Sequence, residues 1–248
     1  DLMELLLLCQ AARLSFAKSV HVVLPHFPYE RQDRVAESRE PISAQLVAQL
    51  IECAGVNHVI VLDLHSDQIQ GFFKVPVDAI VARPLFAEYF LQKKIINPTV
   101  VAPDIGAAKR SKKFADLLGC PLAILHKSRP QHQEVEIQQI VGDIEGRTCI
   151  LFDDIIDTAG TLVSAKKALL TRGANPEVYA AATHPVLSGP ALDRLKDANF
   201  AEVVVTDAIP LPADTNGIHF TVLPTAPLLA RVMQNMASGK SVTEIYGK

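Results

Sequence analysis

The chain has 248 residues, of which 49% are hydrophobic and 21% charged, with a formal net charge of −3. This composition is typical of a globular protein with a packed core, and it excludes an intrinsically disordered chain. The small negative charge gives no reason to expect nucleic acid as a partner. Apolar runs such as residues 5–8 are far shorter than a bilayer span, so no membrane partner is expected.

The cysteines are isolated in apolar surroundings without paired spacing, at Cys9, Cys53, Cys120 and Cys149. This pattern is typical of buried thiols in a reducing compartment. The chain also opens without the charged segment, apolar segment and cleavage site of a secretory signal peptide. We therefore expect a soluble, cytoplasmic protein.

The hydrophobic pattern predicts helices and strands that alternate along the chain. Helices are expected at residues 2–17, 41–54, 85–94, 109–118, 162–171, 191–197 and 228–236. Strands are expected at residues 20–24, 59–62, 99–102, 121–125, 148–152, 178–182, 201–206 and 220–223. Residues 127–133 are expected to be a polar loop, and residues 134–141 one arm of a hairpin that turns at 143–146. This alternation predicts an α/β fold with parallel sheets.

Each half of the chain contains a strand that ends in acidic residues, which favours two related α/β lobes. A linker is expected around residues 77–84. We therefore expect an N-terminal lobe at residues 1–81 and a C-terminal lobe at residues 82–240, with the tail 241–248 returning to the N-terminal lobe.

Residues 153–161 (DDIIDTAGT) lie between a predicted strand and a predicted helix. Such a turn aims backbone N–H groups and the hydroxyls of Thr158 and Thr161 into a concavity at a helix N-terminus, which favours a phosphate dianion. Gly160 allows the backbone to approach a ligand closely. The two carboxylates that open the segment repel phosphate but suit vicinal ribose hydroxyls, which are hydrogen-bond donors. The structural alternative is an ordinary capped helix, with Asp157 or Thr158 as N-cap.

Four further segments combine charged residues with predicted strand ends or loops. They are FPYERQDR at residues 27–34, DLH at 63–65 with QIQGFF at 68–73, PDIGAAKR at 103–110 and HKSRP at 126–130. A histidine and a carboxylate at the end of a buried strand can hold Mg²⁺ on a diphosphate. Taken singly, these segments also suit ordinary structural roles, such as a solvated charged loop.

Together the five segments resemble the ribose-phosphate diphosphokinase family, also called phosphoribosyl pyrophosphate (PRPP) synthetases, over residues 2 to about 246. The resemblance implies two phosphoribosyltransferase-like lobes with mostly parallel sheets flanked by helices. It implies transfer of the diphosphoryl group of ATP to the 1-hydroxyl of ribose 5-phosphate, giving PRPP and AMP, with Mg²⁺ as cofactor. It also implies a homo-oligomer, a hexamer built from dimers. Because the family's chain begins before Asp1, the N-terminal lobe and part of the ATP site are expected to be incomplete.

The resemblance also assigns roles to the matching residues of the ATP side. Lys127 and Arg129 correspond to the family's catalytic cations, carried on a flexible loop that closes over the reacting phosphates. Arg31 and Gln32 correspond to ATP contacts. A loop suits this role because it can close and exclude water, and diphosphoryl transfer needs positive charge where negative charge develops.

On the sugar and metal side, His65 and Asp104 correspond to metal ligands. The ribose 5-phosphate residues correspond to Asp153, Asp154, Asp157, Thr158, Ala159, Gly160 and Thr161. Of these, the first two face the ribose 2- and 3-hydroxyls, and the other five hold the 5-phosphate.

Two other functions stay open at this point. A phosphoribosyltransferase that consumes PRPP would share the turn at residues 153–161 but would not need residues 63–73 or the Lys127 loop. A non-catalytic, PRPP-synthetase-like regulatory subunit would bind ATP without forming AMP.

Overall fold

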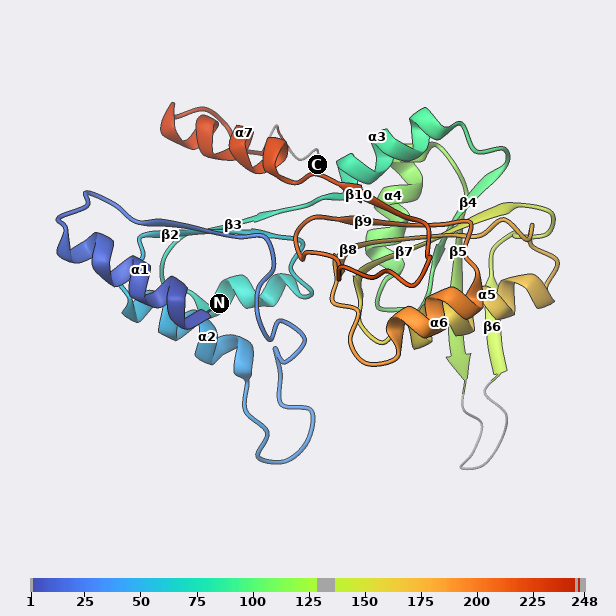
Figure 1. Ribbon diagram of the computed structural model, residues 1–248, viewed down its shortest axis with the longest axis horizontal. Helices are drawn as coiled ribbons and strands as arrows, with labels where there is room; N and C mark the ends of the chain where they lie inside the picture. The colour runs from blue at the N-terminus through green and yellow to red at the C-terminus, as the bar shows by residue number, and fades with distance from the viewer. Residues whose placement is uncertain (1, 129–136, 244, 246–248) are drawn as a thin grey trace. The chain divides into compact units, whose positions relative to one another are not determined.

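The computed structural model describes residues 2–128, 137–243 and 245, and the chain divides into two compact units, Asp1–Val81 and Ala82–Lys248. Each unit has its own sheet, and each is considered by itself (Figure 1). Among the described residues, no helix is long and apolar enough to cross a membrane. Part of the tail 241–248 lies outside the described residues, so its expected return to the first lobe stays a prediction.

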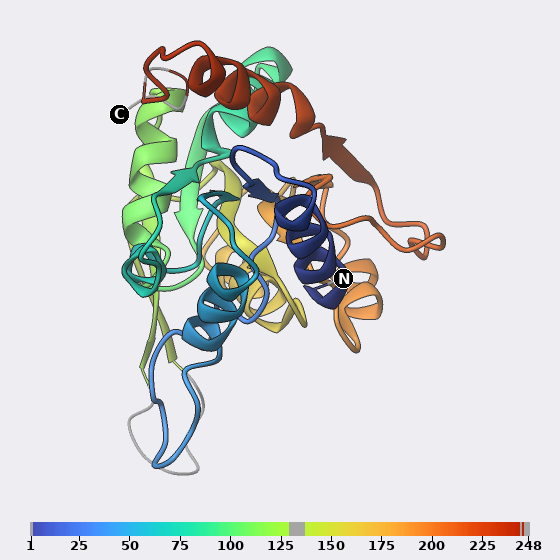
Figure 2. The same cartoon turned by 90° about the vertical axis from the view of Figure 1, so that its left-hand side faces the viewer.

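The first unit is a three-stranded parallel sheet in the order β1-β2-β3. Its elements are α1 (Leu2–Leu14), β1 (His21–Leu24), α2 (Ser43–Cys53), β2 (His58–Leu62), the 3-10 helix η1 (Asp67–Phe72) and β3 (Val77–Ile80). Helices α1 and α2 lie on the same face of this sheet (Figures 1 and 2). Cys9 of α1, Ile51 of α2 and Val59 and Val61 of β2 form one buried cluster there.

The chain divides between Val81 and Ala82, inside the expected linker at residues 77–84, but most of this segment has regular secondary structure. Its first half forms β3, which pairs with β2 through Val77↔Val59 and Ile80↔Leu62. Ile80 is fully buried, so this segment gains both ladder hydrogen bonds and apolar burial. Helix α3 then begins at Arg83, with a proline in its first turn.

The second unit is a seven-stranded sheet in the order β10-β9-β8-β7-β4-β5-β6. Its helices are α3 (Arg83–Lys93), α4 (Ala108–Leu118), α5 (Gly160–Thr171), α6 (Ala191–Ala198) and α7 (Ala226–Ala237). Its strands are β4 (Pro98–Ala102), β5 (Leu122–Ser128), β6 (Ile137–Val141), β7 (Thr148–Ile156), β8 (Tyr179–Pro185), β9 (Glu202–Thr206) and β10 (Phe220–Leu223). Neighbouring strands are parallel except β5 and β6, which confirms the predicted α/β fold with mostly parallel sheets.

The hairpin in this unit differs from the prediction. Strand β6 pairs with β5, from Ile124↔Val141 to Ser128↔Ile137. It does not lie next to β7, so the segment 143–146 does not close a hairpin between these two strands. Both edges of β7 are already paired, with β4 and β8, so β6 finds its partner only at the edge of the sheet. Strand β5 consequently runs through Lys127, which was expected in a loop.

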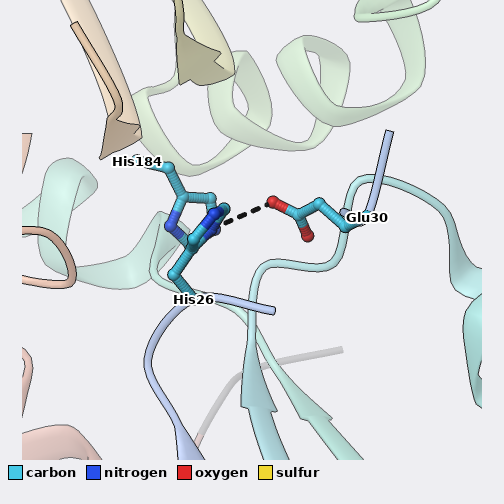
Figure 3. A group of neighbouring side chains, drawn as sticks. All are labelled: His26, Glu30 and His184. Carbon is cyan, nitrogen blue, oxygen red and sulfur yellow. Dashed lines mark ion pairs between the residues drawn. The ribbon is translucent and has the colours of Figure 1, made fainter. Parts of the chain in front are cut away.

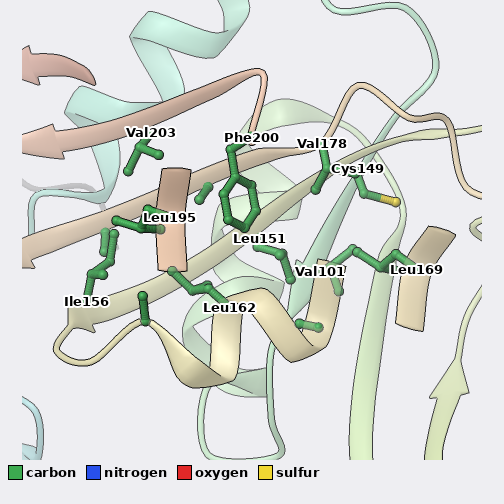
Figure 4. Close-up of a cluster of buried hydrophobic side chains, with 14 of the residues drawn as sticks. Val101, Cys149, Leu151, Ile156, Leu162, Leu169, Val178, Leu195, Phe200 and Val203 are labelled. Atoms are coloured by element: carbon green, nitrogen blue, oxygen red, sulfur yellow. The ribbon is translucent and has the colours of Figure 1, made fainter. Parts of the chain in front are cut away.

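Strand β7 is buried on both faces of the sheet, as expected for a central strand covered by helices. Cys149 and Leu151 pack toward α5 and α6, in the cluster drawn in Figure 4. On the other face Phe152 stacks on Phe114 of α4, with ring centroids 4.2 Å apart. Two packed layers therefore fix the position of the carboxyl end of β7.

The sequence pattern suggested that all four cysteines are buried, but the structure buries only two of them. Cys9 and Cys149 are buried, whereas Cys53 is exposed and Cys120 is intermediate. Burial raises the pKa of the Cys149 thiol to about 12. Cys149 is therefore protonated at neutral pH and a poor nucleophile.

Candidate functional site

The carboxyl ends of β4 and β7 lie next to each other in the second unit. From β4 the chain continues to β5 on one side, whereas β7, β8 and β9 extend the sheet on the other side. The crevice outside such a switch point is the usual ligand site of an open parallel sheet. Asp104 follows β4 here. Asp153 and Asp154 lie within β7, because this strand runs to Ile156 rather than ending before the acidic pair as expected.

The acidic pair is held by an arginine that sequence reasoning left without a role. Nη1 of Arg110, on α4, lies 3.4 Å from Oδ1 of Asp153 and also forms an ion pair with Oδ1 of Asp154. The Asp154 N–H donates to Oδ1 of Asp153 at 2.9 Å. Burial, and then the Asp154 carboxylate, raise the pKa of Asp153 well above its ordinary value, while Arg110 opposes that rise. The guanidinium therefore favours the ionised, hydrogen-bond-accepting form of the pair.

The turn after β7 differs from an ordinary capped helix. Helix α5 begins at Gly160, and its N-cap residue is Ala159, with φ 59° and no side-chain cap. Neither Asp157 nor Thr158 is the N-cap, so that structural alternative is wrong. The first N–H groups of α5 receive no side-chain cap, and such groups bind anions well.

Two residues beyond β8 hold the turn. The Ser188 hydroxyl donates to the Asp157 carboxylate, and the Ser188 N–H donates to the Asp157 carbonyl at 3.1 Å. Nη1 of Arg194, on α6, donates to the Thr158 carbonyl at 3.0 Å. The turn is thus tied to α6 and carries a guanidinium at its edge. Neither Ser188 nor Arg194 is among the site residues expected from the sequence.

Asp104 begins the segment that leads into α4. Its Oδ1 accepts a hydrogen bond from the Ala107 N–H at 2.9 Å, which closes a turn before α4. The backbone of Lys127 lies in β5, opposite Gln138 of β6. Arg129, the second expected catalytic cation, lies outside the described residues, as does most of the expected flexible loop.

In the first unit, the loops after β1 and β2 share one edge of the sheet, because these strands are parallel neighbours. Arg31 and Gln32 are exposed in the loop after β1. The Gln32 N–H donates to the Tyr29 carbonyl at 2.9 Å, and the Gln32 carbonyl accepts from Ala44 of α2 at 3.1 Å. These hydrogen bonds fix the backbone of Gln32, and the side chains of Arg31 and Gln32 both lie on the surface.

Glu30 connects the two loops of the first unit, and sequence reasoning missed it. Its Oε2 accepts a hydrogen bond from the His65 N–H at 3.0 Å. Its Oε1 lies 3.3 Å from Nδ1 of His26, the ion pair dashed in Figure 3. The structure therefore brings the expected ATP contact Arg31 and the expected metal ligand His65 to loops joined through one carboxylate. The third residue of Figure 3, His184, belongs to β8 of the second unit.

Known proteins resemble this chain along almost its whole length. A family model described as the N-terminal domain of ribose phosphate pyrophosphokinase matches residues 1–55, and one described as the phosphoribosyl synthetase-associated domain matches residues 130–246. The ribose-phosphate pyrophosphokinase of Oceanobacillus iheyensis is 48% identical over 245 residues, which cover 99% of this chain and 77% of that protein. The Bacillus subtilis protein of the same name is 46% identical over 245 residues, which again cover 99% of this chain and 77% of that protein.

A solved structure agrees with these relatives. The crystal structure of phosphoribosylpyrophosphate synthetase from Mycobacterium smegmatis matches with a TM-score of 0.88 and 43% identity, over 96% of this chain and 78% of that one. These similarities confirm the resemblance inferred from the five sequence segments. The chain belongs to the ribose-phosphate pyrophosphokinase, or PRPP synthetase, family.

Proposed function

We propose that the protein transfers the diphosphoryl group of ATP to the 1-hydroxyl of ribose 5-phosphate, giving PRPP and AMP. The observation that carries this proposal is the pair Asp153 and Asp154, held by Arg110 beside the uncapped N-terminus of α5. This arrangement offers acceptors for sugar hydroxyls next to donors for a phosphate. Membership of the PRPP synthetase family supports ribose 5-phosphate as the sugar.

On the sugar side, Asp157–Thr161 bind the 5-phosphate, and the acidic pair accepts hydrogen bonds from the 2- and 3-hydroxyls. Both groups are remote from the reacting 1-hydroxyl. Their binding energy therefore orients the nucleophile without contributing to the chemical step directly. The contacts of Ser188 and Arg194 keep the turn in a conformation suited to this task.

On the nucleotide side, Arg31 and Gln32 contact ATP, and Lys127 and Arg129 stabilise the negative charge that develops during transfer. Arginine offers planar donors to phosphate oxygens, and lysine a compact positive charge. Diphosphoryl transfer depends on such positioning and charge more than on covalent help from the protein.

His65 in the first unit and Asp104 in the second are each proposed as ligands of Mg²⁺. The donor at Asp104 fits a hard cation, because it is a carboxylate whose described hydrogen bond, from Ala107, uses Oδ1 alone. Imidazole is a less usual partner for Mg²⁺, so His65 contacts the ion through water. When bound, the metal neutralises charge on the ATP phosphates. A homo-oligomer, a hexamer built from dimers, is part of the proposal by family resemblance.

A direct assay tests the reaction. The purified chain, given ATP, Mg²⁺ and ribose 5-phosphate, should form AMP and PRPP in equal amounts. Lys127→Ala should abolish turnover and leave ribose 5-phosphate binding intact, because Lys127 acts on the nucleotide. Lys113→Ala, which removes an exposed lysine of α4, is the matched control. Unchanged turnover in Lys127→Ala would remove this residue from the mechanism.

The same samples separate the alternatives. Pyrophosphate release from PRPP on addition of a nucleobase would identify a phosphoribosyltransferase instead. ATP binding without AMP formation would identify a non-catalytic subunit.

A further inference from the structure

Two histidines face each other at the amino ends of β1 and β2, away from the loops that carry the proposed ATP and metal residues. His21 and His58 are direct partners in the parallel ladder, so their side chains lie on the same face of the sheet. Their Nδ1 atoms are 3.4 Å apart. His58 is buried and His21 is exposed, so the pair has one side open to solvent.

The outer nitrogen of each ring has an oxygen partner. Nε2 of His58 lies 3.2 Å from the Asp78 carboxylate on β3, and Nε2 of His21 lies 3.0 Å from the Ser19 hydroxyl. The carboxylate is an acceptor, so it fixes the proton of His58 on Nε2 and leaves the Nδ1 lone pair directed at His21. The hydroxyl both donates and accepts, so it suits either tautomer of His21.

This arrangement has two neutral states. In one, the Nδ1–H of His21 donates to Nδ1 of His58, and Ser19 donates to Nε2 of His21. In the other, the Nε2–H of His21 donates to Ser19, and both Nδ1 lone pairs converge on one point. In this second state the two lone pairs repel each other unless a cation lies between them. A rotation of the Ser19 hydroxyl and a change of tautomer convert one state into the other.

The surroundings favour the neutral ring of His58. Burial lowers the pKa of His58, Asp78 opposes this, and His21 lowers it further. A neutral imidazole is the form that ligates a metal ion. The carboxylate on the outer nitrogen of His58 matches the carboxylate–histidine–metal arrangement that orients such ligands in known sites.

We propose that His21 and His58 form a binding site for a divalent first-row transition metal, with Zn²⁺ as the representative ion. Zinc–imidazole distances of about 2.0–2.1 Å and the observed separation of 3.4 Å give an angle of about 110° at the metal, which is tetrahedral. Water on the open side completes the coordination. Imidazole is a good ligand for Zn²⁺, Cu²⁺ and Ni²⁺, whereas Mg²⁺ prefers oxygen ligands. This site therefore differs from the proposed magnesium site. The inference does not depend on the proposed function.

Zn²⁺ titration calorimetry on the full chain tests this site without reference to activity. His21→Gln should weaken Zn²⁺ binding at least tenfold, because it removes one of two protein ligands while leaving an exposed polar side chain. Asp78→Asn should weaken it by about tenfold or more, since outer partners of metal ligands commonly contribute that much. His65→Ala is the matched control, and it should keep this Zn²⁺ site.

Cu²⁺ electron paramagnetic resonance gives a second readout. In the His65→Ala background, the bound Cu²⁺ should show coupling to two imidazole nitrogens, and adding His21→Gln should reduce this to one. Circular dichroism confirms that each variant is folded. Equal Zn²⁺ affinity with and without His21, or no Zn²⁺ binding in the His65→Ala variant at millimolar metal, would overturn the proposal. In the latter case the two rings simply share a hydrogen bond.

Discussion

At the scale of single residues, Arg110 opposes protonation of the acidic pair in the proposed sugar site. It is the cation that acts against the mutual repulsion and the burial of Asp153 and Asp154. Carboxylates accept hydrogen bonds from sugar hydroxyls with both oxygens only when they are ionised. If the pair binds sugar as proposed, Arg110 extends toward lower pH the range over which the carboxylates are ionised and can bind it.

Arg110→Met should shift the pH dependence of ribose 5-phosphate binding. Without the guanidinium, the pKa of Asp153 rises further, so binding should be lost at a higher pH as the solution is acidified. Calorimetric affinities measured across the acidic range check this shift. Lys113→Met on the same helix is the control and should follow the wild-type profile. Superimposable profiles for Arg110→Met and wild type would contradict the role given to Arg110.

Asp153→Asn should stabilise the protein while weakening sugar binding. A raised pKa in the folded state means that the folded protein holds this proton more tightly than the unfolded chain does. Stability is therefore lost as pH rises from the ordinary value of about 4 through the folded-state pKa. The asparagine removes this cost at neutral pH, with a gain of about 1 kcal/mol in the free energy of unfolding. Urea denaturation at neutral pH measures the gain, and a loss of stability would contradict it.

At the scale of elements, the start of α5 depends on one unusual backbone conformation. Ala159 has φ 59° and is buried, whereas a left-handed conformation is uncommon for residues other than glycine, asparagine and aspartate. Strain of this kind is typical of functional turns. It replaces an ordinary side-chain cap and leaves the first amides of α5 directed toward the proposed phosphate.

Ala159→Val should therefore destabilise the protein by about 1–3 kcal/mol, because a β-branched residue is strained in this conformation and overpacks the site. Ala159→Gly should be neutral or slightly stabilising, since glycine adopts this conformation without strain. Chemical denaturation of both variants checks the difference. Similar stabilities for the valine and glycine variants would show that the positive φ carries no strain.

The type and order of most elements were predictable from the sequence, because buried parallel strands are short runs of Val, Ile and Leu between helices. The ends of strands were not. Asp153 and Asp154 interrupt the apolar pattern of β7, yet the strand continues because its ladder with β8 reaches Pro185. The pairing of β6 was missed for a similar reason, since it depends on which sheet edges are already occupied.

The candidate site was predictable where its residues are close in sequence. The proposed phosphate-binding turn, residues 153–161, is one segment of nine residues, and its expected chemistry follows from its composition. Glu30 and Arg110 act through partners 35 and 43 or 44 residues away, as the contacts to His65 and to Asp153 and Asp154 show. Sequence spacing cannot reveal such pairs, because strand order decides them.

At the scale of the whole molecule, the residues expected to bind the substrates divide between two compact units. Every residue proposed to bind ribose 5-phosphate lies in the second unit, as do its seven-stranded sheet and the apolar cluster of Figure 4. The expected ATP contacts Arg31 and Gln32 lie in the first unit. Binding of sugar and binding of nucleotide should therefore be separable.

Residues 82–248, expressed alone, should fold and bind ribose 5-phosphate, and they should bind ATP much more weakly than the full chain because they lack Arg31 and Gln32. The sheet is covered on both faces by helices of the same unit, so its core does not require the first 81 residues. Circular dichroism and calorimetry check folding and binding. The Asp154→Asn fragment is the control: it should fold and bind the sugar phosphate at least tenfold more weakly, because an acceptor for a hydroxyl is lost. A folded fragment with equal affinity in both forms would contradict the placement of the sugar on the acidic pair, whereas an unfolded fragment would contradict the independence of the second unit.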